Sequence, residues 1–254
     1  MTMQPLVSVI TPVYNNQLTV LDAILSVKSQ QYNNWELILI DDCSSDDSFK
    51  IISDAAEGDT RIKVSQTTSN SGAAHARNLG INLATGRFIA FLDADDMWTS
   101  DKLEKQVAFS IEKKAALTHT SYQYMDAKGK PLEKVIAAKK QLGYAEMLNY
   151  NYIGCLTAMY DTEVLGGKVL MPILKKRQDY ALWLNILKMD HQAFGLDEVL
   201  AYYRTGMASL SSNKWEAIRY NFILLRYVEG LSLMRTLYHF SNYSIIGLKK
   251  YFFS

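Results

Sequence analysis

The first hundred residues alternate between short, mainly apolar runs and longer segments whose apolar residues recur at helical spacing. The runs have the length of strands, and the unbroken one over residues 88–92 is typical of a strand buried on both faces. The runs cover residues 6–11, 35–40, 62–64 and 88–92, and the helical spacing covers residues 18–30, 46–56 and 73–84. The first run stops at Pro12, where we expect the strand to end. Strands separated by helices predict an α/β fold with a mostly parallel sheet and helices on its faces.

The second half of the chain is less regular. Its apolar pattern predicts helices over residues 101–114 and 180–188, and strands over residues 119–125, 153–160 and 195–203. No element is predicted for the polar stretch that ends at Lys140. A loop over residues 175–178 brings Asp179 to the start of the second helix, and the small, polar residues 204–213 are expected to form a lid-like loop.

An acidic cluster follows the fourth apolar run. Asp93, Asp95 and Asp96 come directly after Leu92, at the end of a predicted central strand. In a parallel sheet, this edge is where open α/β folds bind ligands. Two carboxylates in a D-x-D arrangement can bind one divalent cation and leave positions for phosphates. The alternative is that Asp95 or Asp96 caps a helix that begins near Ser100.

The amino-acid composition excludes several classes of protein. The chain has 254 residues, 48% of them hydrophobic, and a net charge of +1, so it can bury a large core and has no bias toward nucleic acid. The two cysteines, Cys43 and Cys155, indicate neither a disulfide framework nor a zinc site, which fits a cytoplasmic protein. The N-terminus does not resemble a signal peptide, and no apolar stretch has the length of a membrane span.

The segment over residues 214–254 is helical by pattern and combines aromatic with basic residues. Such a helix suits an anionic membrane surface. The alternative is that the aromatic residues pack against the main domain. For Tyr251 to Phe253 the sequence favours the membrane.

Four motifs occur in a recognisable order: VSVITPVYN, LILIDDCSSD, NSGAAHARNLGINLATGRFIAFLDADD and RQDYALWL. Together they resemble the inverting family-two nucleotide-sugar glycosyltransferases, which have the GT-A fold, a Rossmann-like mixed sheet flanked by helices. The blocks IGCLTAMY, RQDYALWLNILK and SSNKW are similar to a subgroup that builds bacterial surface polysaccharides. The resemblance implies a nucleotide-sugar-binding half over residues 1–98 and an acceptor-binding half over residues 99–213, followed by the C-terminal helical extension.

The resemblance also implies which residues bind the donor. Pro12 and Tyr14 would line the base and ribose pocket, where a tyrosine ring can pack on a flat pyrimidine. Asp42 would accept a hydrogen bond from the uracil N–H. The other implied donor-binding residues are Asn70, Gly72, Arg77, Asp93, Arg204, Ser209 and Ser211. Structural alternatives are a strand-end turn for Pro12 and Tyr14, a helix cap for Asp42 and a surface salt bridge for Arg77.

The same resemblance implies which residues bind the metal and which residue is the catalytic base. Asp95 would be the direct ligand of Mn²⁺ or Mg²⁺, with Asp93 as a second metal residue that serves the ribose or the outer shell. Asp179 falls where the family places its catalytic base, which removes the acceptor hydroxyl proton as that oxygen attacks the anomeric carbon. The metal would stabilise the charge that develops on the leaving UDP. The alternative for Asp179 is a helix cap.

Three positions depart from the family pattern. Cys43 replaces the glycine that usually follows the first acid pair, so the turn is expected to differ slightly. Gln178 replaces a frequent glutamate, although the subgroup also has glutamine there. Many relatives carry a histidine in the loop after Tyr203, where this chain has Gly206 and Met207.

The implied function is transfer of a hexose or N-acetylhexosamine from a UDP-sugar to a saccharide acceptor on a lipid diphosphate carrier. The product would belong to O-antigen, capsule or teichuronic acid, made at the inner face of the cell membrane. A nucleotidyltransferase is one alternative, but the stretch TPVYNNQ lacks the expected glycine-rich, basic phosphate loop. A silent sugar- or nucleotide-binding module is another, and the presence of Asp42, Asp95 and Asp179 argues against a decayed site.

Overall fold

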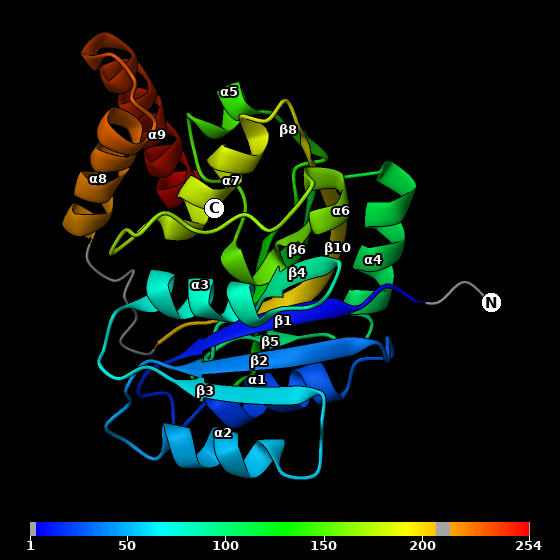
Figure 1. Cartoon of the computed structure of the whole chain (residues 1–254). Helices are drawn as coiled ribbons and strands as arrows, with labels where there is room; N and C mark the ends of the chain where they lie inside the picture. Colours follow the sequence, from blue (N-terminus) through cyan, green and yellow to red (C-terminus); the bar gives the residue numbers. More distant parts are fainter. Residues whose placement is uncertain (1–3, 207–213, 254) are drawn as a thin grey trace.

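The computed structural model describes residues 4–206 and 214–253, which are built on a ten-stranded mixed sheet (Figure 1). Along the sheet the order is β3 (Ile62–Gln66), β2 (Trp35–Asp41), β1 (Val7–Val13), β4 (Phe88–Phe91), β9 (Met159–Asp161), β6 (Leu117–Met125), β10 (Ala193–Arg204) and β5 (Met97–Trp98). β7 (Pro131–Ile136) pairs with β6, and β8 (Gln141–Leu142) with β10. The first four strands in this order are parallel, as the alternating pattern predicts. β9 is antiparallel to both β4 and β6, so β4 and β6 point the same way.

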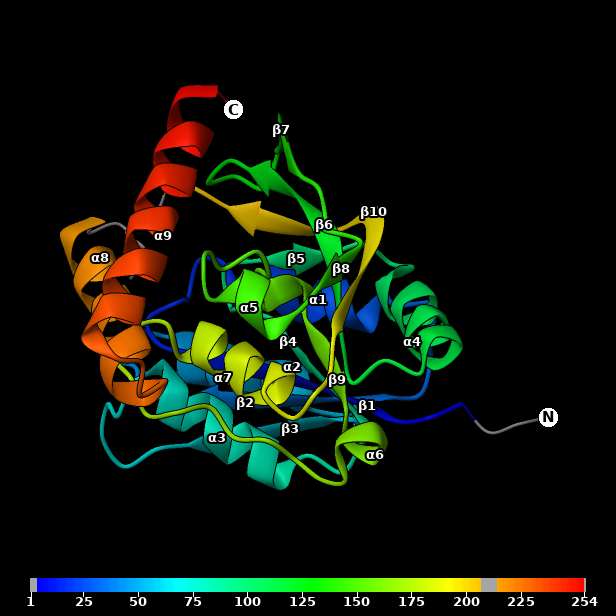
Figure 2. The same cartoon turned by 90° about the horizontal axis from the view of Figure 1, so that it is seen from above.

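Helices cover both faces of the sheet (Figures 1 and 2). Side chains of α1 (Val20–Lys28), α2 (Ser48–Ala56) and α4 (Lys102–Lys113) share one core with one face of the strands. Those of α3 (Ala73–Leu83) and α7 (Gln178–Leu187) share the other core. Along β1, Val9 faces the first core and Ile10 the second, because successive side chains of a strand point to opposite faces. Burial on both faces explains the unbroken apolar run of β4 and the mainly apolar runs of β1 and β2, whereas the edge strand β3 is only partly buried.

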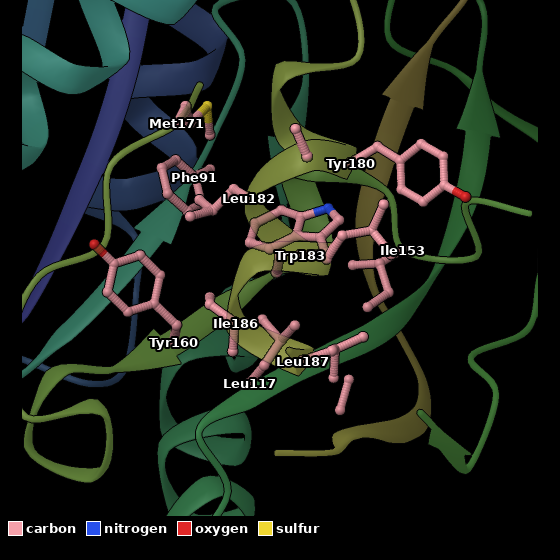
Figure 3. Close-up of a cluster of buried hydrophobic side chains, with 14 of the residues drawn as sticks. Phe91, Leu117, Ile153, Tyr160, Met171, Tyr180, Leu182, Trp183, Ile186 and Leu187 are labelled. Carbon is pink, nitrogen blue, oxygen red and sulfur yellow. The ribbon is translucent and has the colours of Figure 1, made fainter. Parts of the chain in front are cut away.

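The second core surrounds α7, whose buried side chains contact strands and loops from much of the chain (Figure 3). Trp183 packs edge-on against Phe91 of β4, with ring centroids 5.7 Å apart. Met171 and Tyr160 also lie in this cluster. The helix whose second residue is the predicted base, Asp179, is therefore fixed to the central strand by apolar packing.

Three sequence predictions about local structure are wrong or incomplete. β1 continues through Pro12 to Val13. The backbone nitrogen of Pro12 points to the side of β1 where β4 pairs, and β4 ends before this position. The missing N–H of proline therefore leaves no hydrogen bond of the sheet unmade. Residues 153–160 form a 3₁₀ turn, η1 (Cys155–Thr157), before the short strand β9, and the polar stretch before Lys140 contains β7. Two short helices, α5 (Tyr144–Met147) and α6 (Thr162–Leu165), carried no recognisable pattern.

The C-terminal extension consists of α8 (Lys214–Ile223), a π-helical turn η2 (Leu224–Val228) and α9 (Leu233–Phe253), which lie beside α7 (Figure 2). Leu224 and Leu225 enter the second core, Phe240 packs against it, and Phe222 packs edge-on against Phe240. The packing alternative is therefore correct for Phe240, whereas Phe222 contacts another helix of the extension. Tyr227 and Tyr238 are instead 73% and 62% exposed. The side chains of residues 251–253 lie outside the described part of the chain, and within that part no helix is long and apolar enough to cross a membrane.

Candidate active site

Two loops at the C-terminal edge of the sheet are joined by side-chain hydrogen bonds. The Asn15 N–H donates to Ser44 Oγ at 3.0 Å, and the Ser45 N–H donates to Asn15 Oδ1 at 2.9 Å. Pro12 is half-buried, and Tyr14 is 48% exposed in the first of these loops. The two residues predicted to line a base pocket thus have accessible surface at the edge where such folds bind ligands.

Asp42 follows the last residue of β2, and its carboxylate organises the loop before α3. Its Oδ1 accepts hydrogen bonds from Thr67 Oγ1 and the Ser71 N–H, each at 2.9 Å, and its Oδ2 accepts from the Gly72 N–H at 2.7 Å. Gly72 has a φ of 88°, which favours glycine. The cap alternative for Asp42 is wrong, because α2 has Asp47 as its N-cap residue. Asn70 lies exposed in the loop that Asp42 holds.

Cys43 adopts a φ of 61°. This left-handed conformation is one that glycine enters at little steric cost and that other residues adopt rarely. The chain therefore turns after Asp42 in a geometry that suits the glycine of the family pattern, although a cysteine occupies the position.

Arg77, on α3, is 5% exposed and donates from Nη2 to Asp93 Oδ1. Burial lowers the pKa of Arg77, but the Asp93 carboxylate raises it above its ordinary value, and Asp179 adds to this increase. Its Nε and Nη1 are buried without a hydrogen-bond partner among the described residues. Arg77 is thus a fixed cation with unused donors, and the alternative of a surface salt bridge is wrong.

The carboxyl groups of the acidic cluster after β4 have raised pKa values, because they are buried and close to one another. Burial and the neighbouring Asp93 raise the pKa of Asp95 to about 6. Asp96 is 1% exposed; its Oδ1 accepts from the Arg204 N–H at 2.9 Å, and its Oδ2 has no partner among the described residues. Burial and Asp95 raise the pKa of Asp96 well above its usual range. The cap alternative is wrong here also, because the N-cap residue of α4 is Asp101.

Arg204, at the end of β10, is 4% exposed and binds protein groups. Its guanidinium donates from Nε to the Asp95 carbonyl at 2.7 Å, from Nη1 to the Ala127 carbonyl at 3.0 Å and from Nη2 to Asp22 Oδ2 at 2.8 Å. It therefore holds the loop of the acidic cluster against α1, and its contact with a diphosphate stays a prediction. The remaining two lid candidates, Ser209 and Ser211, lie outside the described residues, as does Met207.

Asp179 lies in the first turn of α7 and is partly exposed. The N-cap residue of this helix is Arg177, so Asp179 is not its cap. Asp179 contributes to the raised pKa of Arg77 and of Cys155, so its negative charge acts on both buried groups. Asp179 therefore shares the electrostatic environment of the Arg77–Asp93 pair.

Sequence reasoning missed two features of this edge. Burial raises the pKa of the Cys155 thiol well above its usual range; Arg77 opposes this shift, while Asp93 and Asp179 add to it. Cys155 therefore lies among the site's charged groups, which its apolar surroundings in the sequence did not indicate.

The second feature is a tyrosine cluster, with the Tyr124 ring 5.8 Å from Tyr122 and 5.4 Å from Tyr203. Alternate positions on a strand share a face, so Tyr122 and Tyr124 could have signalled it.

A divalent cation fits the acidic cluster. Among the described residues, no group of three or more His, Cys, Asp or Glu side chains could hold a metal ion unaided. Mg²⁺ in nucleotide sites needs only one or two carboxylates together with substrate phosphates, and Mn²⁺ prefers similar ligands. Asp93 and Asp95 provide two carboxylates, and burial together with the neighbouring Asp93 raises the pKa of Asp95, so a cation at this position would favour its ionised form.

The profile of glycosyl transferase family 2 matches residues 8–165. The chain belongs to this family. Over 247 residues it is 43% identical to the proposed teichuronic acid biosynthesis glycosyltransferase TuaG of Bacillus subtilis, covering 97% of this chain and 98% of that one. It is 37% identical over 251 residues to WfgD of Escherichia coli, named as a UDP-Glc:alpha-D-GlcNAc-diphosphoundecaprenol beta-1,3-glucosyltransferase, covering 98% and 96% of the two chains. The family predicted from the four motifs is thereby confirmed.

Solved structures confirm the fold. S. aureus TarS in complex with UDP-GlcNAc superposes with a TM-score of 0.71 at 19% identity, over 93% of this chain and 71% of that one. The mannosyltransferase PcManGT from Pyrobaculum calidifontis, in complex with GDP-Man and Mn²⁺, gives a TM-score of 0.63 at 18% identity, over 100% and 77%. These neighbours, together with the mixed sheet and its helices, confirm the predicted GT-A architecture.

Proposed function

We propose that this glycosyltransferase is metal-dependent and inverting, and that it moves a hexose or N-acetylhexosamine from a UDP-sugar to a saccharide on a lipid diphosphate. The observation that carries the proposal is the convergence of Asp42, Arg77, Asp93 and Asp95 at one edge of the sheet, with Asp179 close by. The name of TuaG supports a product in teichuronic acid or another surface polysaccharide, such as O-antigen or capsule, and the name of WfgD supports a saccharide acceptor on a lipid diphosphate.

The donor nucleotide would lie across the ends of β1, β2 and β4. Tyr14 has an exposed ring that can pack on uracil, with Pro12 beneath the same loop. Asp42 has capacity for a further hydrogen bond at Oδ2, which accepts only one among the described groups. The unused N–H groups of Arg77 are suited to the ribose or the phosphates.

Asp95 and Asp93 would hold Mn²⁺ or Mg²⁺. When bound, the cation supplies Lewis-acid stabilisation of the diphosphate oxygens. The role of the chain is to keep the two carboxylates side by side, and Arg204 contributes by donating to the Asp95 carbonyl. Arg77 occupies one oxygen of Asp93, which leaves Asp95 as the freer ligand.

Asp179 would act as the general base. A partly exposed carboxylate can reach the acceptor hydroxyl and remove its proton as the bond to the anomeric carbon forms. Attack from the face opposite the nucleotide inverts the anomeric configuration. The tyrosine cluster lies on the same edge, at the ends of β6 and β10, and offers flat surfaces to the acceptor saccharide.

A lipid-linked acceptor requires contact with the membrane, which we place at its cytoplasmic face. Leu233, Met234, Leu237 and Tyr238, on the first two turns of α9, are between 49% and 80% exposed. Arg235 is exposed among them. Apolar side chains interspersed with a basic one suit an anionic lipid surface.

The test is UDP release from a panel of UDP-hexoses and UDP-N-acetylhexosamines, with Mn²⁺ or with EDTA. We expect turnover with one or two donors, its loss in EDTA, and a loss of about 10²-fold or more in Asp179→Asn. Asp54→Asn, at an exposed position on α2, is the matched control and should retain activity. Tight, metal-independent nucleotide binding without turnover would instead identify a silent binding module, and a product with retained anomeric configuration would exclude inversion.

A further inference from the structure

Two consecutive basic residues precede the proposed base, and each is held by a different helix of the C-terminal extension. Lys176 Nζ forms a salt bridge with Glu216 Oε2 of α8 at 2.6 Å. Arg177 donates from Nη2 to the Tyr243 hydroxyl of α9 at 2.5 Å, and its guanidinium carbon lies 5.6 Å from the centroid of that ring. The loop before Asp179 is therefore bound from outside by α8 and α9.

These contacts hold the loop before Asp179 firmly against the C-terminal helices. The Lys176 side chain is only 11% exposed. Arg177 adopts a φ of 69°, a left-handed conformation that a non-glycine residue keeps only where its surroundings hold it. Its carbonyl accepts a hydrogen bond from the Ala181 N–H at 2.9 Å, and its side chain donates to Tyr243, so α7 and α9 both restrain it.

Tyr243 is itself well anchored. Its ring stacks on Tyr150 with a centroid separation of 5.3 Å and an interplanar angle of 25°. One residue earlier on α9, Asn242 Nδ2 donates to Asn149 Oδ1 at 2.8 Å. The position of α9 is thus set by the loop that follows α5, and α9 passes this constraint to Arg177.

We propose that α8 and α9 form a clamp on the catalytic loop, and that Tyr243 and Glu216 are positioning residues for Asp179. The inference rests on the proposed role of Asp179 as the base. Asp179 is the second residue after Arg177, so a shift of the loop moves its carboxylate directly. The donor-binding residues lie on other elements, so the clamp should affect the chemical step and leave donor binding unchanged.

The experiment compares kcat and KM for the UDP-sugar in Tyr243→Phe, which removes the hydroxyl and keeps the ring, and in Glu216→Gln. We expect each variant to lower kcat by about 5-fold to 100-fold, as misplacement of a catalytic group does, with KM unchanged. Lys176→Glu and Glu216→Lys should each lower kcat, and the double variant, which restores the pair with reversed charges, should recover it.

Lys188→Gln is the matched control. It breaks the 2.5 Å salt bridge between Lys188 and Glu229, which joins the same extension to the other end of α7. This variant should lower the melting temperature and leave kcat unchanged. Wild-type kcat in both Tyr243→Phe and Glu216→Gln, or an equal loss in Lys188→Gln, would overturn the clamp.

A second measurement separates failure of the clamp from failure of the proposed base. If Asp179→Asn inactivates the enzyme but the clamp variants do not, only the clamp is wrong. If Asp179→Asn remains active, the base assignment is wrong, and amide hydrogen exchange then decides on the clamp. Faster exchange confined to residues 174–180 in Tyr243→Phe would support it, and unchanged exchange there would overturn it.

Discussion

The guanidinium of Arg77 on α3 pairs with the carboxylate of Asp93 after β4, and this ion pair joins the helix to the acidic edge of the sheet. The two residues are sixteen positions apart in the sequence. The pair places a permanent positive charge under the cluster of Asp93, Asp95 and Asp96. Removing the Arg77 guanidinium would leave Asp93 without its ion-pair partner and would increase the repulsion among these carboxylates.

Arg77→Ala should therefore lower the free energy of unfolding by about 2–3 kcal/mol, because it leaves part-buried carboxylates unpaired. UDP binding should weaken in the same variant. Arg61→Ala is the control: Arg61 also pairs with an aspartate, Asp59, but its side chain is 41% exposed. That substitution should cost less than about 1 kcal/mol. Equal losses in urea unfolding would show that burial of the Arg77 pair is unimportant.

Gly80 and Gly247 provide a matched pair of helical glycines with opposite predicted effects. A Cβ at Gly80 would lie 2.6 Å from Ile10 Cγ2, so Gly80→Ala forces either α3 or the buried Ile10 side chain to shift, at a cost of about 1–3 kcal/mol. A Cβ at Gly247 of α9 would meet nothing within 4 Å. Gly247→Ala should stabilise by up to about 1 kcal/mol through helix propensity. Thermal unfolding of both variants is the measurement, and a shift of the same sign in both would contradict the prediction.

The left-handed turn at Cys43 predicts a further pair of effects. Cys43→Gly should keep activity and leave stability unchanged or raise it by up to about 1 kcal/mol, since glycine adopts the φ of 61° without steric cost. Cys43→Val should lower stability by about 1–2 kcal/mol, because a β-branched residue is poorly tolerated there. Urea unfolding checks both, and a more stable valine variant would refute the role assigned to the turn.

The first half of the fold could be predicted because three of its strands, β1, β2 and β4, are almost fully buried and therefore mainly apolar, while its helices bury one face and therefore show helical spacing. The same reasoning failed over residues 153–160. There an apolar stretch forms η1, because the carbonyls of Leu156 and Thr157 accept hydrogen bonds from Trp98 Nε1 and Gln106 Nε2, at 2.8 and 2.9 Å. These donors lie more than fifty residues away in the sequence, so the local pattern of apolar and polar residues could not indicate them.

In the candidate site, too, some residues could be predicted from the sequence and others could not. Asp42, Asp93, Asp95 and Asp179 were recognisable because each occupies a motif at the end of a strand or the start of a helix. The pairing of Arg204 with Asp22 was not, because these residues lie 182 positions apart and meet only when β10 is placed beside the sheet edge. The clamp contacts of Lys176 and Arg177 likewise depend on how the C-terminal helices dock.

Lys102, a buried residue of α4, should make the stability of the fold depend on pH. It is fully buried and donates to Gln106 Oε1 and, at 3.4 Å, to the Thr157 carbonyl, at the end of the turn that carries Cys155. Its Nζ lies 4.8 Å from the centroid of the Trp98 ring. Burial lowers the pKa of Lys102 to about 7. The ammonium group is therefore charged in the folded protein only at acidic to neutral pH.

In the unfolded chain a lysine keeps its proton until about pH 10.4, so between pH 7 and pH 10 the unfolded state binds more protons than the folded state. Stability contributed by this group must therefore rise with pH over that window. We expect the slope of unfolding free energy against pH between 7 and 9 to be larger in wild type than in Lys102→Met, by up to about 1.4 kcal/mol per pH unit. Lys113→Met, on the same helix with a 41% exposed side chain, should keep the wild-type slope. Urea titrations at pH 7, 8 and 9 measure all three slopes, and identical slopes for wild type and Lys102→Met would mean that Lys102 stays protonated in the folded core.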